Sequence, residues 1–114
     1  MKKPIECRTM REIFSTPKRW TKYREFATKD GKDCHRSDAQ SCCLVGALSL
    51  IHVLDYSEAQ ITLLNKIKEY SKGVKRLSRL RIKSVPGWND HKRVKFEDVR
   101  AVVRMWRDEK ASAR

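Results

Sequence analysis

Apolar side chains recur along this chain at helical spacing more often than at the alternating spacing of strands. In the run CCLVGALSLIHVL they fill nearly every position, which predicts a buried central helix over residues 42–54, with Ser41 as its N-cap. At 13 residues the run is too short to cross a bilayer. Gly46 in its middle lowers helix propensity by about 1 kcal/mol relative to alanine, so we expect a bulky neighbour to approach it closely.

The end of the chain carries the clearest periodicity. Five apolar residues recur at i, i+3, i+6, i+7 and i+10 and place one stripe on a helix: Phe96, Val99, Val102, Val103 and Trp106. Residues 57–72 predict another helix, in which Ser57 and Gln60 form a capping box and Gly73 marks the end.

The remaining segments have weaker patterns. Residues 5–15 predict a short amphipathic helix that ends before Pro17, and residues 18–27 a second short helix or turn. Residues 74–83 fit a helix and an extended piece equally well. Together these elements predict an all-α single domain, residues 1–114, with four to five helices packed around the buried helix at 42–54.

Charge changes this picture more than any other property. The chain has 27 Lys and Arg against 14 Asp and Glu, a net charge of +13 and a pI near 10.0. Residues 1–56 hold 11 basic and 7 acidic residues, whereas residues 57–114 hold 16 and 7. Such a field attracts nucleic acid, an anionic membrane or an acidic protein surface. The alternative is that the charge serves solubility alone.

The basic residues concentrate in two places. Eight of them and one acid, Glu69, lie between Lys66 and Lys83, and a second group repeats at i, i+4 and i+7 along the last helix. Like charges at that spacing repel each other, so a partner that neutralises them is favoured over a merely solvated basic face. The residues that we assign to a nucleic-acid or partner-binding surface are Lys72, Lys75, Arg76, Arg79, Arg81, Lys83, Arg100, Arg104 and Arg107.

The residues that follow the amino terminus indicate where the protein is located. No apolar segment follows Met-Lys-Lys, so we expect no signal peptide, no membrane partner, a cytoplasmic protein and reduced cysteines. Cys34-His35 and Cys42-Cys43 are adjacent pairs, with Cys7 as a spare thiol, whereas structural zinc sites separate paired ligands by two to four residues. We therefore expect no metal and no cofactor.

A thiol-dependent or hydrolytic enzyme is the alternative function. Cys43 lies near a predicted helix start, where the helix dipole lowers a thiol pKa. His35 or His91, with Asn89 or Asp90, would complete a catalytic set. The apolar run around Cys43 has the opposite effect, because burial raises a thiol pKa. We therefore favour a binding protein over an enzyme.

The stretch SVPGWNDHKR, residues 84–93, precedes the last helix. We expect Trp88 to pack into the core over Gly46 and its neighbour. Asn89 and Asp90 are residue types that satisfy backbone N–H groups at turns and helix starts. The stretch therefore positions the last helix or, alternatively, forms a functional polar pocket.

Three quoted stretches carry a resemblance: WTKYREFATKDGKD (20–33), CLVGAL (43–48) and WND (88–90). Together they are similar to an uncharacterised family of small helical proteins from bacteria and their phages, catalogued as a domain of unknown function, with W…D-x-x-G, C-x-x-G-A and W-N-D motifs. The similarity spans about residues 5–108. The candidate structural or pocket motif is Trp20, Cys43, Gly46, Trp88, Asn89 and Asp90.

The resemblance implies a cytosolic, mostly α-helical, often phage-borne protein and supplies no activity. Two departures from the family pattern stand out: Lys95 where a threonine usually caps the last helix, and the more basic segment 72–83. We expect a small basic binding protein, phage- or mobile-element-encoded. Its partner would be nucleic acid, a nucleic-acid-handling host complex that it inhibits, as in counter-defence, or an acidic protein surface. The sequence sets no oligomeric state.

Overall fold

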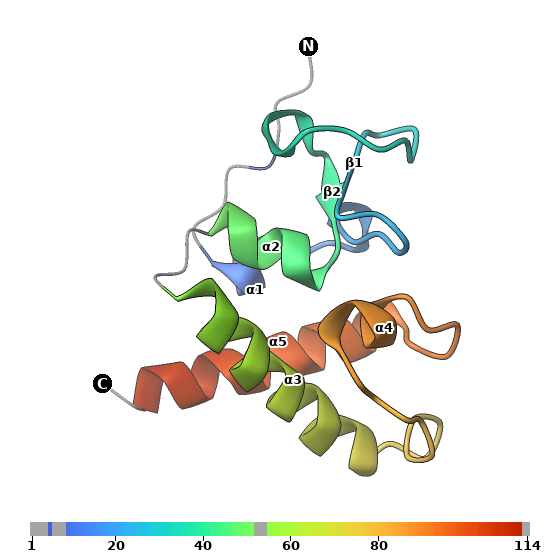
Figure 1. The fold of residues 1–114 in the computed structure, drawn as a ribbon, viewed down its shortest axis with the longest axis vertical. Coiled ribbons are helices and arrows are strands. Elements are labelled where there is room, and N and C mark those ends of the chain that lie inside the picture. Colours follow the sequence, from blue (N-terminus) through green and yellow to red (C-terminus); the bar gives the residue numbers. More distant parts are fainter. Residues whose placement is uncertain (1–4, 6–8, 52–54, 113–114) are drawn as a thin grey trace.

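The computed structural model describes residues 5, 9–51 and 55–112, with side chains described up to residue 106. Helices dominate it, as the apolar spacing predicts, and Figure 1 shows a small two-stranded sheet beside them. In chain order the elements are α1 (Met10–Ile13), the 3₁₀ helix η1 (Pro17–Arg19), β1 (Phe26–Ala27), the 3₁₀ helix η2 (Arg36–Asp38), β2 (Ser41–Cys42), α2 (Leu44–Leu50), α3 (Tyr56–Lys72), α4 (Val85–Asn89) and α5 (Phe96–Ser112).

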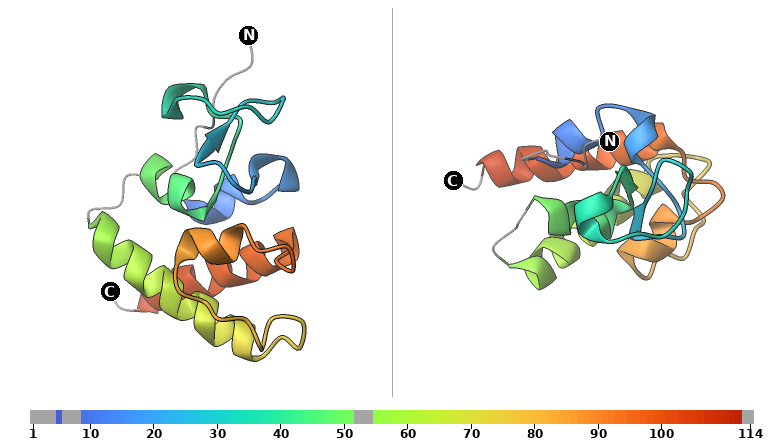
Figure 2. Two further views of the ribbon diagram at one scale, coloured as in Figure 1. Left: turned by 45° about the vertical axis from the view of Figure 1, so that its right-hand side comes forward. Right: turned by 90° about the horizontal axis from the view of Figure 1, so that it is seen from above.

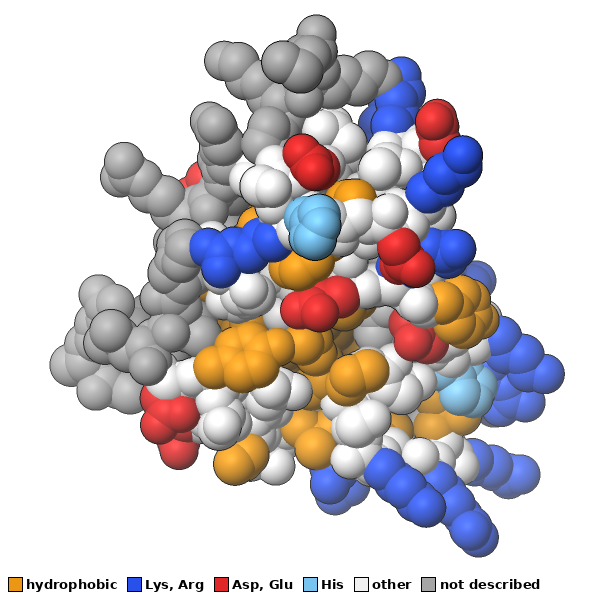
Figure 3. All heavy atoms as spheres, turned by 45° about the horizontal axis from the view of Figure 1, so that its top comes forward, with side chains coloured by type: hydrophobic (Ala, Val, Ile, Leu, Met, Phe, Trp, Pro, Cys, Tyr) orange, Lys and Arg blue, Asp and Glu red, His pale blue; other side chains and the backbone are white. Residues whose placement is uncertain are grey.

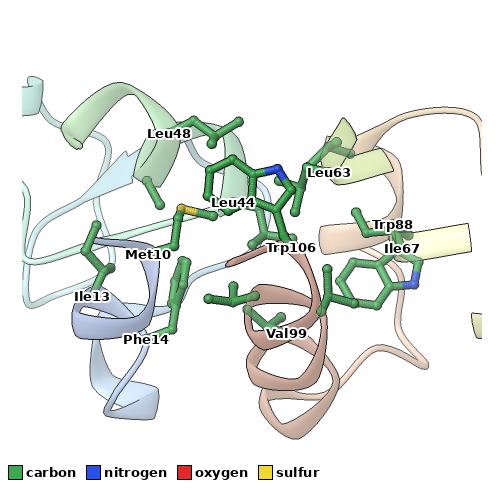
Figure 4. Close-up of a cluster of buried hydrophobic side chains, with 14 of the residues drawn as sticks. Met10, Ile13, Phe14, Leu44, Leu48, Leu63, Ile67, Trp88, Val99 and Trp106 are labelled. Atoms are coloured by element: carbon green, nitrogen blue, oxygen red, sulfur yellow. The ribbon is translucent and has the colours of Figure 1, made fainter. Parts of the chain in front are cut away.

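The two long helices, α3 and α5, cross each other and form one half of the molecule. Figures 1 and 2 show the sheet, α1 and α2 stacked above this crossing, with α4 beside it. All five α-helices contribute to one cluster of buried side chains (Figure 4): Met10 from α1 and Phe14 at its C-cap, Leu44 and Leu48 from α2, Leu63 and Ile67 from α3, Trp88 from α4, and Val99 and Trp106 from α5. Burying each large apolar side chain contributes about 1.5–3 kcal/mol to folding, so this shared core fixes α4 and the start of α5.

The predicted central helix is shorter than its apolar run. Ser41 and Cys42 form β2, which pairs antiparallel with β1 in the register Phe26 to Cys42. Cys43, not Ser41, is the N-cap, and its sulfur accepts a hydrogen bond from the Gly46 N–H at 3.4 Å. The prediction for 41–43 was wrong because the backbone there pairs with the 20–27 segment instead of starting a helix. Residues 52–54 of the predicted helix lie outside the described residues.

The segment 18–27 is mostly irregular and ends in the strand β1, so the second short helix is confirmed only as the single 3₁₀ turn η1. Its backbone bonds to the strand beyond it: the Thr21 N–H donates to the Cys42 carbonyl at 3.1 Å, and the Cys43 N–H donates to the Glu25 carbonyl at 3.1 Å. These long-range bonds satisfy groups that a helix would have satisfied locally. The spacing of apolar residues within the segment does not show that these long-range backbone bonds compete with a local helix.

The helix predicted at 57–72 is confirmed with a different start. Asp55 is the N-cap of α3, and its carboxylate accepts from the Glu58 N–H at 2.9 Å, which replaces the expected Ser57–Gln60 box. The helix ends at Lys72 with Gly73 as the C-cap, in right-handed backbone geometry. Among the described residues, 74–84 contain no helix or strand, and the buried Leu77 anchors this segment to the core.

Gly46 has the close neighbour that its position demands, although it is not Trp88. A Cβ placed on Gly46 would lie 2.4 Å from the Glu25 carbonyl oxygen and 3.2 Å from the Phe26 ring. Real Cβ atoms do not approach backbone oxygens so closely. The glycine therefore lets α2 lie directly against the chain that leads into β1.

Gly46→Ala should lower the free energy of unfolding by about 1–3 kcal/mol, because a rigid backbone carbonyl would have to move. Gly73→Ala is the matched control, since its Cβ would meet only the Tyr70 carbonyl oxygen at 3.6 Å. We expect that control to be neutral or to add up to about 1 kcal/mol. Urea unfolding of both variants measures the difference, and equal stability of the two would contradict the packing assigned to Gly46.

Candidate functional site

The WND stretch is the point where distant segments meet, and Asn89 is its centre. The Asn89 side chain is fully buried in α4. Its Oδ1 accepts from the Trp20 Nε1–H at 2.8 Å and from the Leu44 N–H at 3.2 Å. Its Nδ2 donates to the Thr21 carbonyl and to Asp90 Oδ1, both at 3.0 Å. All of the hydrogen-bonding capacity of this amide is therefore used inside the protein.

Trp20 lies between this amide and the start of α5. Its ring centroid is 6.2 Å from that of Phe96, and the Lys22 ammonium lies 5.4 Å above the indole. The same ammonium donates to the His91 carbonyl at 2.7 Å. The indole thus has an apolar contact, a cation and a hydrogen-bond acceptor, which fix the orientation of its ring.

Asp90 holds the neighbouring loop. Its Oδ1 accepts from the Tyr23 N–H at 2.7 Å, while Asn89 donates to the same oxygen. Tyr23 has a φ of 69°, in the left-handed region that non-glycine residues rarely adopt. The hydrogen bond to Asp90 therefore stabilises a loop conformation that the backbone disfavours.

The structure brings together most of the candidate motif. Trp20, Asn89 and Asp90 are hydrogen-bonded as described, and Cys43 and Gly46 form the first turn of α2 beside Leu44. Trp88 is buried on the α3 side of α4, where its Nε1–H donates to Ser71 Oγ at 3.1 Å. Asn89 does not cap α5, because its side chain bonds to two other segments instead, Trp20–Thr21 and the start of α2.

Asn89→Ala should lower the free energy of unfolding by at least about 2 kcal/mol, because it leaves the Leu44 and Trp20 N–H groups without their acceptor. Asn65→Ala, at an exposed position of α3, is the control and should stay within about 0.5 kcal/mol of the parent. Thermal or urea unfolding measures both changes. A loss at Asn89 no larger than at Asn65 would contradict the joining role of this amide.

The enzyme alternative depends on Cys43, whose surroundings are those of an inert thiol. Burial is the largest influence and raises the pKa of Cys43, the Gly46 and Val45 N–H groups oppose it, and the Asp90 and Glu25 charges raise it further. Asn89 has no donor or acceptor left for a thiol, and His91 Nδ1 accepts from the Arg93 N–H at 3.1 Å. Burial therefore keeps the thiol protonated at neutral pH, while the Asn89 amide and His91 Nδ1 are engaged in other hydrogen bonds.

Neither a metal site nor a membrane-spanning helix is present in the described part of the chain. Nowhere in it do three His, Cys, Asp or Glu side chains gather in a set that could hold a metal ion. Cys34, Cys42 and Cys43 are not part of a disulfide, and Cys7 lies outside the described residues. Within the same residues, no helix combines the length and apolar character needed to cross a membrane.

The basic segment between α3 and α4 is mostly exposed. Figure 3 shows Lys and Arg side chains gathered at one edge of the molecule, on the chain between α3 and α5, while the middle of that face is apolar and acidic. Within the described residues, none of the following five predicted site residues forms an ion pair: Lys72, Lys75, Arg79, Arg81 and Lys83. Their charges are therefore available to a partner.

Arg76 is different from its neighbours, because its guanidinium binds a buried carboxylate. Nη1 and Nη2 lie 2.8 and 2.9 Å from the two oxygens of Asp98, whose side chain is fully buried in the first turn of α5. Tyr70 Oη and the Lys95 N–H also donate to Asp98, each at 2.7 Å. Four donors surround this carboxylate, so Arg76 fastens the basic segment to α3 and α5.

The same arginine reaches a second loop. Arg76 Nη1 also donates to the Arg93 carbonyl. Three exposed cations follow the WND stretch on that loop, Lys92, Arg93 and Lys95, and Arg76 thereby holds them beside the 72–83 segment. The surface predicted from the sequence does not include these three cations, although the basic run HKRVK was a signal that could have identified them.

The arginines of α5 belong to a separate basic area. Arg100 and Arg104 are exposed and line a hollow of about 70 Å³ together with Arg11 of the short helix α1. The side chain of Arg107 lies outside the described residues. The two predicted basic groups are thus two areas with different lining residues.

Acid should weaken the Arg76–Asp98 link. Burial alone would raise the pKa of Asp98, but hydrogen bonds from Arg76, Tyr70 and the Lys95 N–H outweigh it and hold that pKa below the ordinary value of 3.8. A lowered folded-state pKa means that the stabilisation is complete above about pH 3.8 and is lost as the pH falls through the folded-state value.

Asp98→Asn should therefore be less stable at neutral pH, by roughly 3 kcal/mol, and should lose less stability than the parent on acidification below pH 3.8. Asp30→Asn, at an exposed turn, is the control and should follow the parent curve. Urea unfolding at several pH values between 2 and 7 checks this. Parallel curves for the parent and Asp98→Asn would contradict the charged state assigned to Asp98.

The fold and this site define a small, mostly helical domain in which a buried asparagine joins an extended amino-terminal segment to two helices. The chain belongs to a family of unknown function, DUF6197, whose sequence profile matches residues 7–109. The expected membership in an uncharacterised family is confirmed at that level. No curated protein and no solved structure matches the chain.

Proposed function

We propose that this protein binds nucleic acid through the cations between α3 and α5. The observation that supports it most is a group of exposed Lys and Arg side chains without ion-pair partners among the described residues, on segments that are themselves firmly anchored. The surface consists of Lys72, Lys75, Arg79, Arg81, Lys83, Lys92, Arg93 and Lys95. Phosphate groups neutralise such a set and release condensed counterions, which supplies affinity that does not depend on base sequence.

The basic segment is anchored to the core, which distinguishes this surface from a run of charged residues that is merely solvated. Leu77 is fully buried and Arg76 is held by Asp98, so the residues on either side have fixed positions. Fixed cations lose less conformational entropy on binding than cations on a free loop. Arg76 supports the surface from within, and we therefore leave it out of the set that contacts phosphate.

The wider biological role rests on the resemblance alone. We propose an accessory protein of a phage or mobile element, acting in the host cytoplasm on nucleic acid or on a host complex that handles it, for example as a counter-defence inhibitor. An acidic protein surface would satisfy the same cations. The measurement below distinguishes it from nucleic acid.

The test is binding to labelled DNA and RNA across a salt series, measured by fluorescence anisotropy. We expect log Kd to rise linearly with log salt, with a slope equivalent to several released counterions and binding that persists at physiological salt. Arg79→Glu with Arg81→Glu should weaken binding at least tenfold. Both are exposed and outside the Arg76–Asp98 network, so the fold should survive.

The control changes net charge equally at a distance from this surface. Lys29→Glu with Lys32→Glu alters two exposed lysines of the turn after β1. We expect it to weaken binding much less than the Arg79 and Arg81 pair. Equal losses would mean a diffuse attraction without a site, and no binding by the parent at physiological salt would overturn the proposal in favour of an acidic protein partner.

A further inference from the structure

We propose that Tyr23 is a base-stacking residue at the end of this basic surface, and that the polymer it serves is single-stranded nucleic acid. The inference rests on the proposed function and adds the class of nucleic acid. It begins from a side chain that the core does not use. Tyr23 is 70% exposed, more than Tyr56 at 37% or Ile61 at 59%, the other large apolar residues that lie exposed in the described structure.

The backbone of Tyr23 is in an unfavourable conformation. Its φ of 69° is one that glycine or asparagine adopts more readily than a bulky aromatic residue. Within the described residues it is the sole non-glycine position with a positive φ. A strained conformation that persists at an exposed aromatic residue points to a role outside the core.

The loop is nonetheless held firmly. Asp90 Oδ1 accepts from the Tyr23 N–H at 2.7 Å, and the adjacent Lys22 donates to the His91 carbonyl at 2.7 Å. Through Asn89, the same junction reaches Trp20 and the start of α2. The ring therefore projects from a preorganised support, which lowers the entropy lost when it contacts a partner.

Cations lie next to this support on the proposed surface. Asp90 leads directly into His91, Lys92 and Arg93, and the last two are exposed. Arg76 donates to the Arg93 carbonyl and so ties this turn to the 72–83 segment. Two acids also lie at this junction: Asp90, whose Oδ1 accepts two N–H groups, and the exposed Glu25. The backbone of an exposed aromatic residue is thus hydrogen-bonded to the stretch that leads into the exposed cations Lys92 and Arg93.

This combination fits a single strand better than a duplex. In a duplex the bases are stacked on each other, and a ring at the protein surface reaches only the backbone and groove edges. In a single strand each base offers a free face that an aromatic side chain can stack on, while lysine and arginine follow the phosphates. A duplex would gain from the cations alone.

The experiment compares one sequence in two forms, a labelled 20-nucleotide single strand and its duplex, by anisotropy at physiological salt. Tyr23→Gly removes the ring and relieves the positive φ, so the fold is retained. It should weaken single-strand binding by roughly 5- to 150-fold and duplex binding by less than about twofold. The salt slope should not change, because no phosphate contact is lost.

Two further variants complete the design. Tyr23→Trp keeps a stacking ring and should retain single-strand affinity, with its fluorescence quenched on binding. Tyr56→Ala removes an exposed tyrosine that lies near Glu25 and Cys43 and should change neither affinity. Circular dichroism melting confirms that each variant is folded.

Four outcomes overturn the inference. If Tyr23→Gly matches the parent while Arg79→Glu with Arg81→Glu weakens binding, the nucleic-acid function stands and the stacking role is wrong. If Tyr23→Gly weakens the binding of both forms equally, the residue supports the fold of the surface and does not distinguish a single strand from a duplex. If Tyr23→Trp binds as weakly as Tyr23→Gly, the ring does not act by stacking. If the parent binds neither form, the proposed function and this inference fail together.

Discussion

A single buried amide group determines how this small domain is assembled. The Asn89 side chain has two acceptor directions and two donor hydrogens, and all of them are used on groups from Trp20, Thr21, Leu44 and Asp90. Backbone bonds already pair the segment around Trp20 with the residues that lead into α2, and the Asn89 side chain adds α4 to this arrangement. A buried polar side chain is costly unless fully satisfied, and here that condition is met only in one arrangement of the three segments.

A second polar centre performs the corresponding task for the carboxyl-terminal half. Asp98 is buried beneath Arg76 and Tyr70, and also accepts from the Lys95 backbone before α5 begins. The two centres differ in chemistry, because one is neutral and the other is an ion pair that is about one third exposed at the arginine. Acid therefore acts on the anchoring of the basic segment through Asp98, whereas the Asn89 amide itself carries no charge.

The elements with strong local signals could be predicted from the sequence, and those that depend on distant partners could not. The stripes of α3 and α5 show their helices directly, because packing one face on a core requires that spacing. Ser41 has the chemistry of an N-cap, yet strand pairing with the Phe26 segment moves the cap to Cys43. For the site, the basic segment and the WND stretch could be found. Arg76, however, looks the same as Arg79 in a row of cations, and only the buried Asp98 distinguishes them.

Arg76 has a consequence for how such a protein can diverge. Arg76 and the buried Leu77 hold the segment in place. None of the described contacts shows the charged side chains at the exposed positions around them stabilising the fold. Substitutions at Lys75, Arg79 or Lys83 can then accumulate with little risk of unfolding, while a substitution at Arg76 removes one of the contacts that hold the segment. Under the proposed function, the partner preference of this surface can therefore change while the scaffold that holds it stays constant.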